Sequence, residues 1–167
     1  MTRQSDQTTQ MAEAPANPAS EGTLVLDQFL PYRLNLVSET VSRSFARLYA
    51  QQFAMDRPEW RVIAIVGQFG RVTAKTVSER STMHKTKVSR AVAALEKKGF
   101  IERTPNPEDL REIFLDLTPE GRRAYDTLVP QALTFSRHLM DTLSPTERAQ
   151  LETILGKLTE AAATFDV

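Results

Sequence analysis

The chain of 167 residues has no cysteine, one tryptophan and only six glycines. Without cysteine it can form no disulfide and no thiolate–zinc site, and it cannot sense oxidants through a thiol. No apolar run is longer than that of residues 62–66, which is far below the ~20 residues that a membrane-spanning helix needs. No apolar leader is visible at the start of the chain, so we expect a cytoplasmic protein that has no membrane partner.

Enzymatic features are scarce as well. His84 and His138 are the two histidines, and neither has the spacing of a metal-ligand pair or of a nucleophile–base pair. No glycine-rich phosphate loop precedes a helix. We therefore expect no catalytic residue, no metal site and no cofactor, and a protein that is not an enzyme.

Helical periodicity dominates after residue 24, and one stretch changes to an alternating, strand-like pattern. The patterns predict helices at 32–53, 56 to 67 or 70, 73–80, 84–98, 118–142 and 144–164, and strands at 100–103 and 111–117. Asp56 with Glu59, and Ser144 with Glu147, are spaced as capping boxes, and Thr82 is a candidate cap for the helix at 84–98. The first and the last two helices carry more apolar surface than a small central module can cover, which predicts a second copy of the chain as partner.

The formal charge of zero hides a segregation of charge. Residues 71–103 hold nine basic and three acidic side chains, a net +6, which leaves twelve basic and eighteen acidic ones, a net −6, elsewhere. The nine are Arg71, Lys75, Arg80, Lys85, Lys87, Arg90, Lys97, Lys98 and Arg103. A basic cluster on one module is typical of a surface that binds phosphates.

The helix expected at 84–98 has two contrasting faces. Turned at 100° per residue, one face holds Val88, Ala91, Val92 and Leu95, and the opposite face holds Thr86, Arg90, Ala93 and Lys97, flanked by Lys87 and Ser89. Small and hydroxyl-bearing side chains among basic ones suit a major groove, where Arg or Lys can bond guanine and Ser or Thr can bond bases or phosphates. A solvated charged face is the alternative. The short helix, three-residue break and hairpin around this helix favour DNA binding.

Seven short motifs, in unbroken order, resemble the MarR (multiple antibiotic resistance regulator) family from about residue 29 to the C-terminus. They are Glu59–Ile63, Val77–Arg80, Val88–Val92, Leu95–Arg103, Asp109–Arg111, Leu117–Gly121 and Leu143–Glu147. The resemblance implies a fold that is mainly α with a small β-hairpin wing: a winged helix-turn-helix flanked by N- and C-terminal dimerisation helices. The corresponding domains are a disordered tail (1–24), an N-terminal dimerisation and ligand-pocket helix (25–54), a winged helix-turn-helix DNA-binding module (55–117) and C-terminal dimerisation helices (118–167).

The resemblance also implies a function in transcription regulation. A homodimer would bind a pseudo-palindromic, double-stranded DNA operator and repress nearby genes until a small ligand releases it. Carried over by position, the DNA contacts of the recognition helix are Lys85, Thr86, Lys87, Ser89 and Arg90. The wing contact is Arg111, steadied by Asp109. Position 110, commonly a second basic residue in the family, is Leu here, and Glu108 and Asp109 make the wing tip acidic.

Two segments, Phe29–Asn35 and Met83–Lys87, resemble the branch of the family that senses aromatic acids or their coenzyme A thioesters. An anionic aromatic ligand needs a cation, hydrogen-bond donors and an aromatic wall in an apolar cleft. The candidate ligand-binding residues are Arg33, Asn35, Ser42, Arg43 and Trp60. Each has a structural alternative, since Trp60 can be a packing residue and Arg43 a surface base.

The alternative function is a winged-helix adaptor that binds proteins and not DNA. The +6 cluster argues against it, and the salt dependence of DNA affinity separates the two. The sequence alone gives neither the effector, the operator nor the regulated genes, and it does not separate a repressor from an activator.

Overall fold

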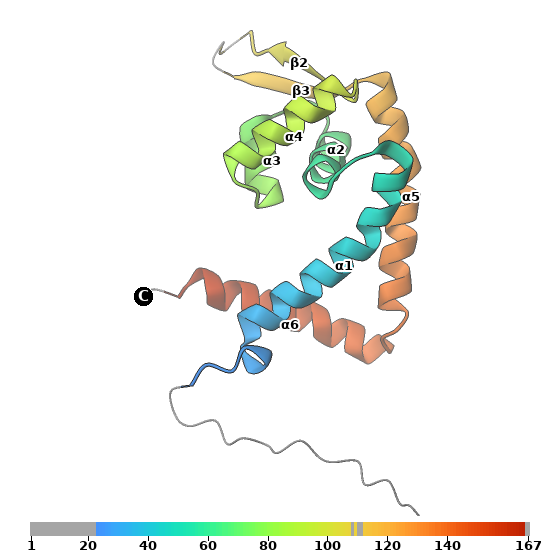
Figure 1. The fold of residues 1–167 in the computed structure, drawn as a ribbon. Coiled ribbons are helices and arrows are strands. Elements are labelled where there is room, and N and C mark those ends of the chain that lie inside the picture. Colours follow the sequence, from blue (N-terminus) through green and yellow to red (C-terminus); the bar gives the residue numbers. More distant parts are fainter. Residues whose placement is uncertain (1–22, 108, 110–111, 166–167) are drawn as a thin grey trace, which may run out of the picture. The chain divides into compact units, whose positions relative to one another are not determined.

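The computed structural model describes residues 23–107, 109 and 112–165 (Figure 1). Most of the expected tail at 1–24 lies outside these residues. The chain forms two compact units, Met1–Glu39 and Thr40–Val167. Within the described residues, no helix combines the length and the apolar character needed to cross a bilayer.

The first unit holds a short 3-10 helix, η1 (Leu26–Gln28), and the start of α1 (Leu30–Phe53), which continues into the second unit. Pro31 stands in the first turn of α1, where its missing N–H breaks no hydrogen bond. The apolar side chains of this helix are exposed at Leu34 and Val37 and buried at Phe45 and Tyr49. The two parts of α1 therefore present different surfaces.

The second unit contains the remaining elements, in the expected order of helices, hairpin and helices. They are α2 (Arg57–Phe69), β1 (Val72–Thr73), α3 (Ala74–Ser81), α4 (Lys85–Lys97), β2 (Ile101–Pro105), β3 (Ile113–Leu117), α5 (Pro119–Met140) and α6 (Pro145–Ala163). Figure 1 shows the β2–β3 hairpin beside α4, with α2 and α3 close by. The predicted fold class, mainly α with a small β wing, is confirmed.

Both predicted capping boxes are present. At the start of α2, the Asp56 side chain accepts from the Glu59 amide at 2.8 Å, and Glu59 accepts from the Asp56 amide at 2.7 Å. Ser144 and Glu147 exchange the equivalent bonds at the start of α6. Each box satisfies two backbone donors that the first turn of a helix leaves free. These short sequence signatures therefore locate the starts of two helices.

The sheet has three strands in the order β1-β3-β2, all antiparallel. β2 and β3 form the expected hairpin, with Ile101 opposite Leu117 and Arg103 opposite Leu115. β1 was not predicted, because two residues are too few to show an alternating pattern. β1 pairs with β3 through Val72 opposite Leu115 and ties the end of α2 to the base of the wing.

The turn between α3 and α4 differs from the expectation. Thr82 does not cap α4; it ends α3 in a left-handed conformation with φ 56°. His84 is the cap, and its Nδ1 accepts from the Thr86 amide at 3.3 Å. The Ser78 hydroxyl donates to the Met83 carbonyl at 2.7 Å and fixes the turn from the α3 side. α4 therefore begins at Lys85, one residue later than predicted.

The core of the second unit lies under α4 and the sheet. Val88 and Leu95 of α4 are at most 1% exposed and belong to one cluster with residues of α1, α2, α3, β3 and α5. The approach of α5 is so close that a side chain at Gly121 would collide with the Phe100 carbonyl. This packing fixes the orientation of α4 and leaves its other face exposed.

Candidate nucleic-acid interface

The exposed face of α4 is the face that the sequence predicted. Val88, Ala91, Val92 and Leu95 are buried, whereas Lys85, Thr86, Lys87, Ser89, Arg90, Ala93 and Lys97 are exposed. The five predicted helix contacts thus lie together on one exposed surface. The buried valines and leucine anchor α4 in the core, so its hydroxyl and basic groups face outward.

The nine basic residues of 71–103 fall into two groups. Carboxylates pair with Arg71 (Asp116, 2.6 Å), Lys98 (Glu59, 2.7 Å) and Arg103 (Glu96, 3.0 Å). The remaining six, Lys75, Arg80, Lys85, Lys87, Arg90 and Lys97, have no ion pair with another described residue. All six lie on α3 and α4, so the uncompensated positive charge is concentrated on the helix-turn-helix.

Arg80 is the one of these six whose side chain has a described aromatic contact. Its guanidinium lies 3.9 Å from the centre of the Phe69 ring. A cation over an aromatic face keeps its charge and is held in place by the ring. Arg80 therefore remains available to a phosphate.

The wing is described only in part. Arg111, the predicted wing contact, lies outside the described residues, as do Glu108 and Leu110. At the base of the turn the Asn106 amide donates to the Glu112 carbonyl at 3.0 Å, and the Glu112 amide donates to the Asp109 carbonyl at 2.9 Å. The wing contact thus stays a prediction from the resemblance.

The predicted ligand residues are spread over both units. Arg33 and Asn35 are exposed on α1 in the first unit. In the second unit Ser42 is half-buried and Arg43 is exposed on α1, and Trp60 is half-buried on α2. The ligand-binding role of these five residues stays a prediction.

Trp60 belongs to a cluster of four aromatic rings. Its ring stacks on Tyr49 at 5.9 Å and meets the edge of Phe45 at 5.6 Å, and Phe45 in turn stacks on Phe135 of α5 at 5.5 Å. Burial raises the pKa of the Tyr49 phenol above its ordinary value. Trp60 therefore packs within the protein, and any ligand role would use the part of its ring that remains accessible.

A groove between α1 and α5 borders this cluster. Its volume is about 540 Å³, and it is lined by Leu48, Pro130, Gln131, Thr134, Phe135 and His138. Gln52 of α1 and Gln131 of α5 bridge the two helices through amide hydrogen bonds of 2.9 and 3.2 Å. None of the predicted ligand residues lines the groove. Its residues come from two helices that are far apart in sequence, since Gln52 and Gln131 are separated by 79 positions, so no local sequence pattern could have predicted it.

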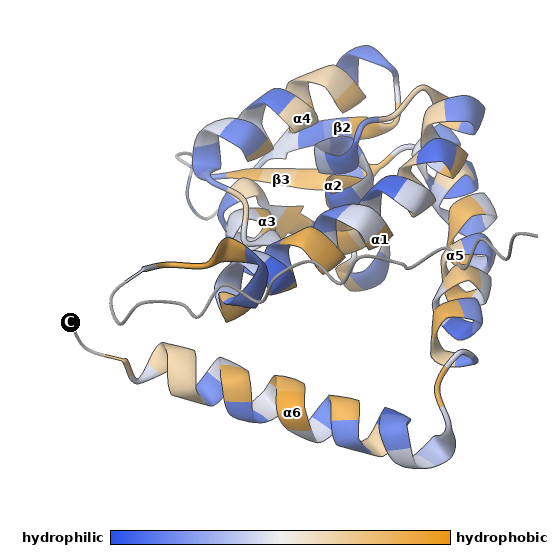
Figure 2. Cartoon of the chain, turned by 60° about the horizontal axis from the view of Figure 1, so that its bottom comes forward, coloured by the Kyte–Doolittle hydropathy of each residue, from blue (hydrophilic) through white to orange (hydrophobic). Residues whose placement is uncertain are grey.

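Apolar side chains are exposed on the C-terminal helices. Leu133 of α5 is 60% exposed, and Ile154 and Leu155 of α6 are 52% and 44% exposed. Figure 2 shows hydrophobic positions recurring along α6, and none of its residues is buried. An exposed apolar surface of this kind is typical of a protein–protein contact.

Comparisons with known proteins agree with this geometry. Residues 55–113 match the family model of the MarR family. An HTH-type transcriptional regulator of Bacillus subtilis, YdcH, is 44% identical over 59 residues, which are 35% of this chain and 40% of that protein. The match thus spans less than half of that relative's length.

Solved structures extend the likeness along the chain. A MarR/EmrR family transcriptional regulator from Acinetobacter superposes with a TM-score of 0.76 at 25% identity, covering 85% of this chain and 100% of that one. MepR of S. aureus, solved as a DNA complex, superposes with a TM-score of 0.72 at 20% identity over 80% of this chain and 98% of that one.

These relatives are transcriptional regulators and not enzymes, as the sequence predicted. The fold of the described chain is the winged-helix fold of MarR-family structures. The likeness to the MarR family model is therefore carried by residues 55–113, the part of the chain that holds α2, α3, α4 and β2.

Proposed function

We propose that the protein is a homodimeric DNA-binding transcriptional regulator, a repressor that binds a pseudo-palindromic operator and is released by a small aromatic acid or its coenzyme A thioester. The observation that carries the DNA-binding part is the exposed face of α4. It combines the predicted contacts Lys85, Thr86, Lys87, Ser89 and Arg90 with uncompensated positive charge. The DNA complex of MepR, which has the same fold, supports it.

A dimer follows from the apolar surface on α5 and α6, which a second copy of the chain would cover. In a two-fold dimer the two recognition helices would enter major grooves about one helical turn, ~34 Å, or a close multiple apart. The operator would then be an imperfect palindrome whose half-sites have that spacing.

Arg90 is central on the exposed face and is exposed itself. If its guanidinium reads a guanine, Arg90→Ala lowers operator affinity by about 1–3 kcal/mol per half-site, roughly 5- to 150-fold, and relaxes discrimination at one base pair. Operator fragments selected from a genomic library, and variants of each base pair, provide the measurement. Arg123→Ala, which removes an exposed base that pairs with Glu120 on α5, is the control and leaves affinity unchanged.

The salt dependence of the same binding separates the regulator from the adaptor. Neutralised phosphates release counterions, so a regulator's log affinity falls steeply with log salt. Duplex binding that is absent, or insensitive to salt across the library, would instead identify a winged-helix adaptor that binds proteins.

We propose that the effector has a higher affinity for a dimer whose recognition helices are wrongly spaced for the operator. The candidate contacts are Arg33, Asn35, Ser42, Arg43 and Trp60. Thermodynamic linkage requires that operator DNA weaken effector binding by the factor by which the effector weakens DNA binding. Titrations with phenolic acids and their coenzyme A thioesters, with and without operator, test this, and effector binding that operator DNA leaves unchanged would refute the mechanism. A reporter gene behind the operator distinguishes repression from activation.

A further inference from the structure

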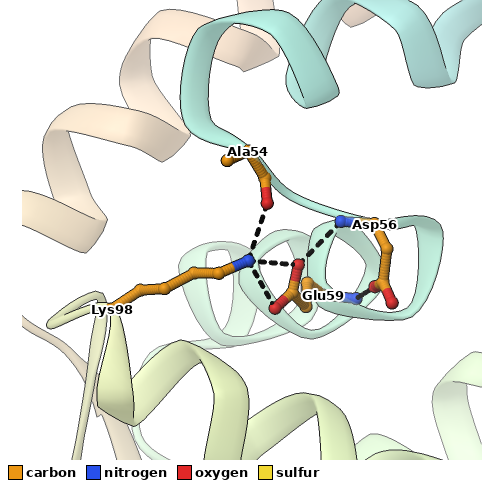
Figure 3. A network of polar contacts seen from close by, with 4 residues as sticks. All are labelled: Ala54, Asp56, Glu59 and Lys98. Atoms are coloured by element: carbon orange, nitrogen blue, oxygen red, sulfur yellow. Dashed lines mark hydrogen bonds and ion pairs between the residues drawn. The ribbon is translucent and has the colours of Figure 1, made fainter.

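Lys97 and Lys98 are adjacent in sequence at the end of α4, but their side chains have different surroundings. Lys97 is exposed and has no ion pair with a described residue. The Lys98 ammonium lies 2.7 and 2.8 Å from the two oxygens of the Glu59 carboxylate and 2.7 Å from the Ala54 carbonyl oxygen (Figure 3). An ammonium has three protons, and here it faces three acceptors. Lys98 therefore has no donor left for a phosphate, although it belongs to the basic cluster.

The Glu59 carboxylate also forms a hydrogen bond with the backbone. Glu59 is 4% exposed, and its Oε2 also accepts from the Asp56 amide as half of the capping box of α2. A carboxylate this buried is strongly unfavourable without a compensating charge. Lys98 supplies that charge from the C-terminal end of α4, so the contact stays closed in the folded protein.

The third acceptor belongs to the joint between α1 and α2. Ala54 follows the last residue of α1 and has φ 50°, a left-handed conformation that is unfavourable for any residue with a Cβ. The Lys98 ammonium holds the carbonyl of this residue and the first turn of α2 together. The end of α4 is thereby tied to the point where the chain turns from α1 into α2.

We propose that Lys98 is a positioning residue that sets how α4 is presented to DNA, by closing on Glu59 and on the Ala54 carbonyl at the α1–α2 joint. The proposal rests on the DNA-binding function proposed above and assigns Lys98 a role other than phosphate contact. Specific binding needs α4 in one orientation, whereas non-specific attraction to phosphates does not. Opening the contact should therefore reduce discrimination more than general DNA affinity.

Three variants and one control test the proposal. Lys98→Met removes the ammonium. Glu59→Gln removes the opposite charge but keeps a side-chain oxygen for the Asp56 amide, so the capping box can persist. The third variant combines the two substitutions. Lys97→Met is the matched control, because it removes a neighbouring charge that has no carboxylate partner.

We expect Lys98→Met and Glu59→Gln each to lower the ratio of operator to non-operator affinity by about 2- to 30-fold. The double variant should lose no more than the more affected single variant, because both remove one contact. The salt slope should stay unchanged in all three. Lys97→Met should instead weaken both kinds of DNA alike, and it should reduce the slope by at most about two for a dimer, since each protomer loses one exposed cation.

A second readout needs no DNA. Amide hydrogen exchange around residues 54–57 and 98–101 should rise together in Lys98→Met and in Glu59→Gln, measured where thermal unfolding shows both variants folded. Unchanged exchange would overturn the proposal. So would a Lys98→Met variant whose DNA affinities and salt slope change as those of Lys97→Met do. A Glu59→Gln variant that binds the operator as well as or better than the wild type would also overturn it. A wild-type protein that binds no duplex would refute the proposed function itself.

Discussion

Phe45→Ala is expected to cost the protein a large part of its stability. The Phe45 side chain is 8% exposed and contacts three other rings, Tyr49, Trp60 and Phe135, at centroid distances of 5.5, 5.6 and 5.5 Å. Replacing a buried phenylalanine by alanine typically costs about 3–5 kcal/mol. The Tyr49 and Trp60 rings already stack on each other at 5.9 Å, so the cluster can close part of the cavity. We therefore expect a loss at the lower end of this range, ~3 kcal/mol in the free energy of unfolding.

Trp60 provides the assay, because it is the only tryptophan in the chain. Urea unfolding followed by its fluorescence and by far-ultraviolet circular dichroism, at one fixed protein concentration, gives the change in free energy of unfolding. Phe69→Ala is the control: its ring is 43% exposed and contacts Arg80, so the expected loss is about 0.5–1 kcal/mol. A loss below about 1 kcal/mol for Phe45→Ala, with unchanged Trp60 emission, would show that the rings are not a structural unit.

Three further outcomes follow from single residues. Gly121→Ala should lower the free energy of unfolding by about 1–3 kcal/mol, because the new methyl group would collide with the Phe100 carbonyl. Thermal unfolding measures this loss, and unchanged stability would show that α5 can shift. Burial raises the pKa of Tyr49, so the neutral phenol contributes its full stabilisation below the ordinary pKa of about 10. This stabilisation is lost as the pH rises through the raised pKa. An absorbance titration of the native protein in which all tyrosines ionise at the ordinary pKa would contradict this expectation. Hydrogen bonds from the Ser144 amide and hydroxyl lower the pKa of Glu147. This cap therefore stabilises the folded protein above the ordinary pKa of the carboxyl, and the stabilisation is lost as the pH falls through the lowered pKa. An NMR titration of Ser144→Ala should show the pKa of Glu147 moving back up.

Features that depend on neighbours in sequence were predicted well. The capping boxes at Asp56 and Ser144 and the inward face of α4 rest on residues three or four positions apart, and the structure confirms them. The capping role expected of Thr82 was wrong, because the chain needs a left-handed residue there to turn from α3 into α4, and the ring nitrogen of His84 replaces the hydroxyl.

Features that depend on distant residues were not predictable in this way. Glu59 and Lys98 are 39 positions apart, and Lys98 looked like one more base of the cluster. β1 exists only because Val72 and Thr73 meet Leu115 and Phe114 of β3. Both features arise from tertiary packing, and a local pattern in a single sequence does not encode which distant segment will lie alongside.

The first half of α5 belongs, by its packing, to the same core as α4. Ala124 and Leu128 have no exposed surface and share one core with Val88 and Leu95 of α4. A fragment cut at Leu117, where the wing ends, would leave that core open. A fragment that keeps this core closed therefore has to reach through Leu128 of α5, and it also has to include Phe45 and Tyr49 of α1.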